Sequence, residues 1–169
     1  MLNNMLTLSR ADEGAIQNAQ EEVDLTAVTE ELLGMYVELA NAKSITIFQH
    51  IEDSLPVRSN RTQMVQLLTI LLDNAVKYAM EGTTLEVHIY SRERNTFFET
   101  VNRCSQLPEC EPDRLFERFY RPDSSRYSDK PGNGIGLSAA RAIVHAYGGL
   151  ISCKYEGKDF IRFTVVFHR

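Results

Sequence analysis

The spacing of apolar residues along the chain predicts three principal helices. Each shows apolar positions three or four residues apart, and they are expected over 25–43, about 61–80 and 135–147. Asp24 is a good N-cap for the first helix, and Ser59 or Asn60 for the second. Gly82 is expected to end the second helix, because glycine readily leaves the helical conformation.

Alternating or β-rich stretches predict five strands around these helices. They are expected at 44–51, 83–91, 97–102, 150–156 and 159–167, with the second and third forming a hairpin. Between the hairpin and the last helix, the region 104–136 is rich in proline and glycine, with one short helix expected at 113–120. A connection of this length is usually functional.

Composition and charge narrow the class of protein. The 169 residues, 43% hydrophobic and 24% charged, suit one soluble globular domain with an appendage. The net charge of -5 argues against a nucleic-acid partner held by phosphate contacts. The charge is uneven, since residues 1–60 carry 3 Lys or Arg and 10 Asp or Glu. The remainder is mildly cationic and would receive an anionic ligand better.

Cysteine usage and hydropathy indicate a cytoplasmic piece. Cys104, Cys110 and Cys153 form no CxxC pair, and we expect buried thiols rather than reactive or metal-binding ones. The longest apolar stretch, 67–72, is broken by Thr69 and is too short for a membrane span. The first residues lack the basic leader and apolar run of a signal peptide.

The second helix carries polar residues whose spacing suits a nucleotide. Asn74, Lys77 and Tyr78 stand at positions i, i+3 and i+4, on one face of a helix. An amide oxygen is a hard ligand for Mg²⁺, an ammonium group neutralises phosphates, and an aromatic ring can stack on a base. Taken alone, the pattern also fits the solvent-exposed polar side of an ordinary amphipathic helix.

A glycine-rich segment precedes the third helix. Gly132, Gly134 and Gly136 stand where free N–H groups at a helix start would favour a phosphate. The segment follows a loop late in the chain rather than an early strand, so a Rossmann motif is rejected. The basic residues of the preceding loop fit either phosphate binding or a solvated surface.

The order of three motifs is more specific than any one of them. LLDNAVKYA, LFERFYR and GNGIGLSAARAIVHAYGG resemble the N box, F box and second glycine box of the ATP-binding domain of bacterial sensor histidine kinases. The resemblance implies a Bergerat α/β sandwich, with about five strands covered on one face by about three helices. LTLSRADEG at 6–14 resembles the end of a dimerisation and phosphoacceptor helix, which implies a remnant over 1–20 and the ATP-binding domain over 21–169.

The resemblance also implies roles for individual residues. Asn74 matches the Mg²⁺-binding asparagine, and Lys77 and Tyr78 match positions beside the phosphates and adenine. Phe116 and Phe119 resemble an aromatic pair that packs the ATP lid, unless they are simply core. The other matched positions are the lid hinge and its box, and the cationic contacts to phosphate: Gly132, Gly134, Gly136 and Leu137, and Arg118 or Arg121.

Three positions depart from the family pattern. Asn102 stands where an Asp of a DxGxG motif accepts a hydrogen bond from the adenine amino group, and neither glycine follows it. The amide oxygen can still accept that bond. Ile70 replaces a polar residue one turn before Asn74, and Ile161 replaces a threonine near the base.

The resemblance implies an enzyme that is incomplete by itself. None of the four histidines, His50, His88, His145 and His168, has the setting of a phosphoacceptor. The expected function is therefore Mg-ATP binding and transfer of the γ-phosphoryl group to a histidine upstream. The expected partners are that upstream dimerisation domain and a cognate response regulator, in a homodimer anchored in the membrane.

Two alternatives remain. A degenerate domain could keep the fold as an interaction module without kinase activity, which the three departures favour. An anti-sigma-type serine kinase shares the fold, although LTLSRADEG and FERFYR favour the histidine kinase.

Overall fold

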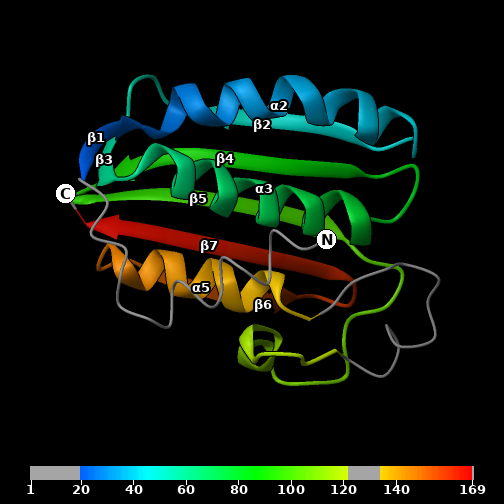
Figure 1. Ribbon diagram of the computed structural model, residues 1–169. Coiled ribbons are helices and arrows are strands. Elements are labelled where there is room, and N and C mark those ends of the chain that lie inside the picture. The colour runs from blue at the N-terminus through cyan, green and yellow to red at the C-terminus, as the bar shows by residue number, and fades with distance from the viewer. Residues whose placement is uncertain (1–19, 122–133, 169) are drawn as a thin grey trace.

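The computed structural model describes residues 20–121 and 134–168 (Figure 1). They form a five-stranded sheet with three α-helices side by side on one face. The helices are α2 (Leu25–Asn41), α3 (Arg61–Tyr78) and α5 (Gly136–Ala146). The strands are β2 (Thr46–Ile51), β4 (Thr84–Arg92), β5 (Asn95–Arg103), β6 (Leu150–Glu156) and β7 (Phe160–His168). This confirms the predicted two-layer sandwich.

The sheet is mixed, in the order β2-β4-β5-β7-β6. β2 and β4 are parallel, and the other neighbours are antiparallel. A parallel pair needs a crossover, which α3 provides between the two strands. The predicted hairpin is β4 and β5, with Val87 opposite Thr100.

Helix caps and apolar faces explain where the helices form. The carboxylate of Asp24 accepts hydrogen bonds from the N–H groups of Thr26 and Ala27 at 3.0 and 3.3 Å. Asn60 accepts from Gln63 N at 3.2 Å and thereby caps α3. The inward faces of α3 and of the central strands are buried, as at Leu68 and Leu85, whereas the edge strand β2 has no fully buried residue. The core therefore lies between the helix layer and the sheet.

Some boundaries differ from the sequence predictions. A second, two-stranded sheet of β1 (Glu21–Asp24) and β3 (Pro56–Ser59) was not expected. α3 ends at Tyr78 because Ala79 has an extended ψ of 141°. The short helix expected at 113–120 is the 3-10 helix η1 (Pro112–Phe116).

The described residues test two of the sequence predictions only in part. The helix remnant expected within residues 1–20 falls almost wholly outside the described residues, which begin at Gln20. The membrane prediction is testable only in part: within 20–121 and 134–168, no helix is both long enough and apolar enough to span a bilayer.

Candidate nucleotide-binding site

Asn74, Lys77 and Tyr78 lie in the last turns of α3, as the sequence predicted. Asn74 is half-buried, and its amide makes no hydrogen bond to any other described side chain or backbone group. The Nζ atom of Lys77 lies 5.0 Å from the centre of the Tyr78 ring. Tyr78 is half-buried and packs on the core, so one side of its ring is already used. An amide oxygen and an ammonium group therefore occupy the end of this helix.

The start of α5 lies beside α3. A Cβ atom on Gly136, the first residue of α5, would sit 3.5 Å from Cγ2 of Ile70, one helical turn before Asn74. No side chain caps α5 at Ile135, and Leu137 packs against the core. The first N–H groups of a helix have no partner within the helix and favour an anion. The structure thus brings two predicted elements, the Asn74 helix and the glycine box, together.

Gly134 joins the glycine box to the segment after η1. Its φ of +66° is unfavourable for a residue with a side chain, and the neighbouring backbone excludes one, because a Cβ would lie 2.8 Å from the carbonyl carbon of Phe119. Phe119 N donates a hydrogen bond to the Gly134 carbonyl at 2.9 Å. Gly132, which was predicted for the same hinge, lies outside the described residues.

The two phenylalanines of the LFERFYR motif separate in the structure. Phe116 is fully buried and meets the Phe163 ring edge-on, with ring centres 6.0 Å apart. Phe119 is 70% exposed. Phe116 is therefore part of the core, and the two rings do not form a buried pair in the described residues.

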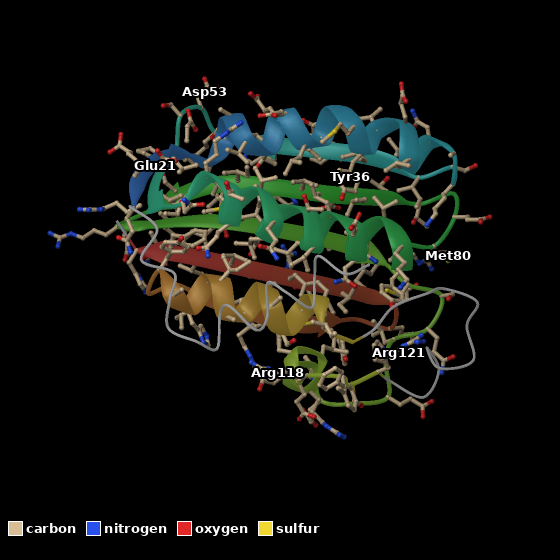
Figure 2. All side chains as sticks on the ribbon, in the orientation of Figure 1. Glu21, Tyr36, Asp53, Met80, Arg118 and Arg121 are labelled. Carbon is tan, nitrogen blue, oxygen red and sulfur yellow. The ribbon has the colours of Figure 1, made fainter. Side chains whose placement is uncertain are left out.

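The predicted cations Arg118 and Arg121 follow η1. Figure 2 shows both in the loop segment below α5, with Arg121 toward the side where Met80 marks the end of α3. Arg118 is exposed and Arg121 is half-buried. Neither is placed against Asn74 by a contact in the structure, so their proximity to phosphate remains a prediction.

The two positions expected near the base are direct neighbours in the sheet. Asn102 of β5 pairs with Ile161 of β7 on one side and with Leu85 of β4 on the other. Asn102 is only 1% exposed, and its Nδ2 donates a hydrogen bond to Sγ of Cys104 at 3.4 Å. Its Oδ1 accepts no hydrogen bond from the residues described. This oxygen is available to a ligand.

Thr100 is a polar residue of this region that the sequence reasoning missed. It is fully buried on the inward face of β5, two residues before Asn102, and its Oγ1 has no hydrogen-bond partner. In the sequence, Thr100 is simply a threonine at an inward position of the strand FFETVN. Such a residue is common in strands and does not by itself indicate a binding site. An unpaired buried hydroxyl points to an absent ligand or water.

Two of the three cysteines are buried, as the sequence predicted. Cys104 and Cys153 are buried, Cys110 is half-buried, and none forms a disulfide. Burial, with a smaller contribution from the other two thiols, raises the pKa of Cys153 to about 12. At neutral pH this thiol is therefore protonated and a poor nucleophile.

These residues fit a nucleoside triphosphate with a divalent cation. In the described ranges, no group of three or more His, Cys, Asp or Glu side chains could hold a metal ion. Mg²⁺ needs few protein ligands when phosphates supply the rest, and one amide oxygen suits this arrangement. The uncapped start of α5 suits the phosphates, Thr100 supplies an unpaired hydroxyl in the sheet, and Asn102 supplies an amide oxygen that accepts no hydrogen bond from the described residues.

Comparison with known sequences places this chain in a family. Residues 59–169 match the model of the histidine kinase-, DNA gyrase B- and HSP90-like ATPases. The probable sensor protein PcoS of Escherichia coli is 32% identical over 161 residues, 95% of this chain and 34% of the relative. The histidine-protein kinase ArlS of Staphylococcus haemolyticus is 35% identical over 113 residues, 67% of this chain and 25% of the relative. The chain thus spans about a third or less of these proteins.

Solved structures share the same fold. The mycobacterial sensor histidine kinase MprB superposes with a TM-score of 0.76 at 21% identity, over 89% of this chain and 97% of that one. Full-length ShkA, solved in complex with AMPPNP, gives a TM-score of 0.83 at 21% identity over 98% of this chain and 34% of its own. At this level of identity the likeness establishes the architecture.

Proposed function

The chain belongs to the histidine kinase-, DNA gyrase B- and HSP90-like ATPase family, and we propose that it binds Mg-ATP and donates the γ-phosphoryl group to a histidine outside it. The observation that supports the proposal is the contact between α3 and α5, in which the uncapped start of α5 lies against Ile70, one helical turn before Asn74. The names of the relatives, a sensor protein and a histidine-protein kinase, support the choice among members of the family.

Each residue of the site has a definite task in this proposal. Asn74 Oδ1 would hold the cation, which when bound neutralises charge on the phosphates and orients them. Lys77 and either Arg118 or Arg121 would add positive charge, and the N–H groups from Gly136 onward would receive phosphate oxygens. Catalysis in this scheme is positioning and charge neutralisation, without covalent chemistry by the chain.

The base would lie toward the sheet. Tyr78 offers the exposed part of its ring, and Asn102 offers an amide oxygen that accepts no hydrogen bond from the described residues. Leu137 follows Gly136 in the first turn of α5 and would contact the nucleotide through apolar atoms.

The acceptor and partners would lie in other parts of the whole protein. No histidine of this sequence has the setting of a phosphoacceptor, so an upstream dimerisation domain would supply the attacking imidazole. We propose a homodimer, anchored in the membrane through segments beyond this chain, with a response regulator as the final recipient of the phosphoryl group.

Calorimetric titration of the full 169-residue chain with Mg-ATP tests this function. We expect Asn74→Ala to weaken Mg-ATP binding by at least about tenfold, because a ligand of the cation is lost. Asn41→Ala, at the exposed end of α2, is the matched control and should leave affinity unchanged. Unfolding curves check that both variants remain folded. Folded wild-type protein that binds no nucleotide at millimolar concentration contradicts the proposal.

The same experiment addresses a non-catalytic module. Ile70 and Ile161 are apolar where related domains carry polar groups, and both are packed in the structure. If the folded chain binds no nucleotide, these replacements favour an interaction domain without kinase activity.

A further inference from the structure

Strand β5 carries three polar side chains, Thr96, Thr100 and Asn102, on the face that points into the core. Thr100 is fully buried and Asn102 is 1% exposed. Other buried hydroxyls are satisfied: Thr29 donates to the Leu25 carbonyl at 2.8 Å, and Ser138 donates to the Ile135 carbonyl at 2.8 Å. Thr100 Oγ1, in contrast, has no hydrogen-bond partner. Among the described residues, the same is true of Ser59 Oγ in the small sheet. Thr100 and Asn102 therefore mark a polar spot inside an otherwise apolar layer.

The surroundings of this spot do not fix the orientation of the Asn102 amide. Its Nδ2 faces Cys104 Sγ at 3.4 Å, and a thiol is both a weak donor and a weak acceptor. A thiol would therefore tolerate the amide turned by 180°, with Oδ1 toward it. The strand neighbours Leu85 and Ile161 have apolar side chains and make no hydrogen bond to the amide. Either end of the amide can thus face a ligand.

An amide that can turn is complementary to two kinds of purine. A 6-amino purine presents an N–H donor at position 6 and an acceptor at N1, and the amide meets these with its oxygen and its NH₂ group. A 6-oxo purine presents an acceptor at position 6 and a donor at N1, and the turned amide meets these equally well. A carboxylate at this position could only accept, and would reject the 6-oxo group.

We propose that Asn102 lets this site take 6-oxo as well as 6-amino purine nucleoside triphosphates, with little preference between them. The proposal rests on the nucleotide-binding function above and adds the base selectivity of that site. The Thr100 hydroxyl can donate or accept a hydrogen bond, so it adds no preference between the two kinds of purine. Ile161 supplies no polar group that could restore one.

The test compares Mg-ATP with Mg-ITP by calorimetry on the full chain. ITP differs from ATP at the 6-position and N1 and lacks the extra 2-amino group of GTP. We expect the two dissociation constants of the wild type to agree within about fivefold, because a bidentate pair of fixed orientation would separate them by about 10–100-fold. We expect Asn102→Asp to weaken ITP relative to ATP by at least about tenfold. Asn95→Asp, at the other end of β5, should leave the wild-type ratio unchanged.

The possible results separate this inference from the proposed function. ATP binding with ITP weaker by about tenfold or more in the wild type overturns the base selectivity and leaves the function standing. Absence of binding of either nucleotide overturns both. Because Asn102→Asp places a carboxyl group in the core and can unfold the protein, the wild-type ratio decides the question without any variant.

Discussion

The backbone geometry at position 134 requires a glycine. Its φ is +66°, and the backbone of Phe119 occupies the place where a side chain would begin. Phe119 itself has a positive φ of 62°, which is uncommon for a bulky residue. The hydrogen bond from Phe119 N to the Gly134 carbonyl holds these two unusual conformations together.

We expect Gly134→Ala to lower the free energy of unfolding by at least about 1–2 kcal/mol, from the left-handed backbone alone. The close approach to Phe119 should add to this and move the start of α5, weakening Mg-ATP binding. Gly34→Ala is the matched control, since no atom lies within 4 Å of its Cβ position and α2 is helical there. In this control the free energy of unfolding, measured with urea, should rise by about 0.5–1 kcal/mol. Equal losses in both variants would contradict this account of Gly134.

Single residues also show what the sequence could and could not predict of the site. Asn74 and Gly136 follow from helix spacing and motif order, and the structure brings their helices together. Thr100 does not, because a threonine in a strand is ordinary and only three-dimensional packing shows that its hydroxyl is unpaired. The hydrogen bond between Asn102 and Cys104 likewise depends on local side-chain directions at the end of β5.

At the scale of elements, the strongest local signals were the most reliable. α2 and α3 begin where Asp24 and Asn60 cap them, and the hairpin of β4 and β5 follows the alternation of the sequence. β1 and β3 were missed because each strand has only four residues, too few to show a clear alternation of buried and exposed positions. Such strands are stabilised by pairing across a long sequence distance rather than by their own pattern.

The pairing of β6 with β7 includes a carboxylate group with a shifted pKa. Arg162 Nε donates to Glu156 Oε1 at 2.7 Å, and Arg162 Nη1 to Glu99 Oε2 at 2.8 Å. The hydrogen bond from Arg162 lowers the pKa of Glu156 below its ordinary value of 4.5. Folding therefore favours the ionised form of this side chain.

This shift predicts a small pH dependence of stability. The contribution of Glu156 is present above pH 4.5 and is lost as the pH falls through the lower pKa of the folded state. Because both side chains are partly exposed, we expect Glu156→Gln to remove only about 0.5 kcal/mol near neutral pH. The difference from the wild type should shrink below about pH 4, measured by urea unfolding at several pH values. A difference that stays constant down to pH 2 would contradict the assignment, because a stabilisation that needs the ionised carboxylate should fall as that group is protonated.

At the scale of the whole molecule, charge is divided along the chain. Residues 1–60 contain 10 of the 23 acidic residues and only 3 of the 18 basic ones. The remaining residues, which include α3, α5 and the segment with Arg118, are mildly cationic. The first strand pair and α2 thus contribute the acidic part of the fold, and the candidate site lies in the other part.

A ligand that bridges α3 and α5 should stabilise the whole domain. At a Mg-ATP concentration of about 100 times the dissociation constant, the expected gain is about 2.7 kcal/mol, seen as a rise in Tm. EDTA should remove most of that gain when ATP is present, because the cation links Asn74 to the phosphates. EDTA without nucleotide should leave Tm unchanged. A rise in Tm that persists in EDTA would show that Asn74 does not act through a metal.

The small sheet of β1 and β3 has a mechanical consequence. Its register sets Glu21 opposite Ser59, the residue before the Asn60 cap of α3, and Asp24 opposite Pro56. Because Glu21 and Ser59 lie at the same end of an antiparallel pair, a tension between Glu21 and the start of α3 would open these backbone hydrogen bonds one after another, beginning beside Asn60. The small sheet thus joins the first described strand to the N-terminal end of α3, and Asn74 lies near the other end of that helix.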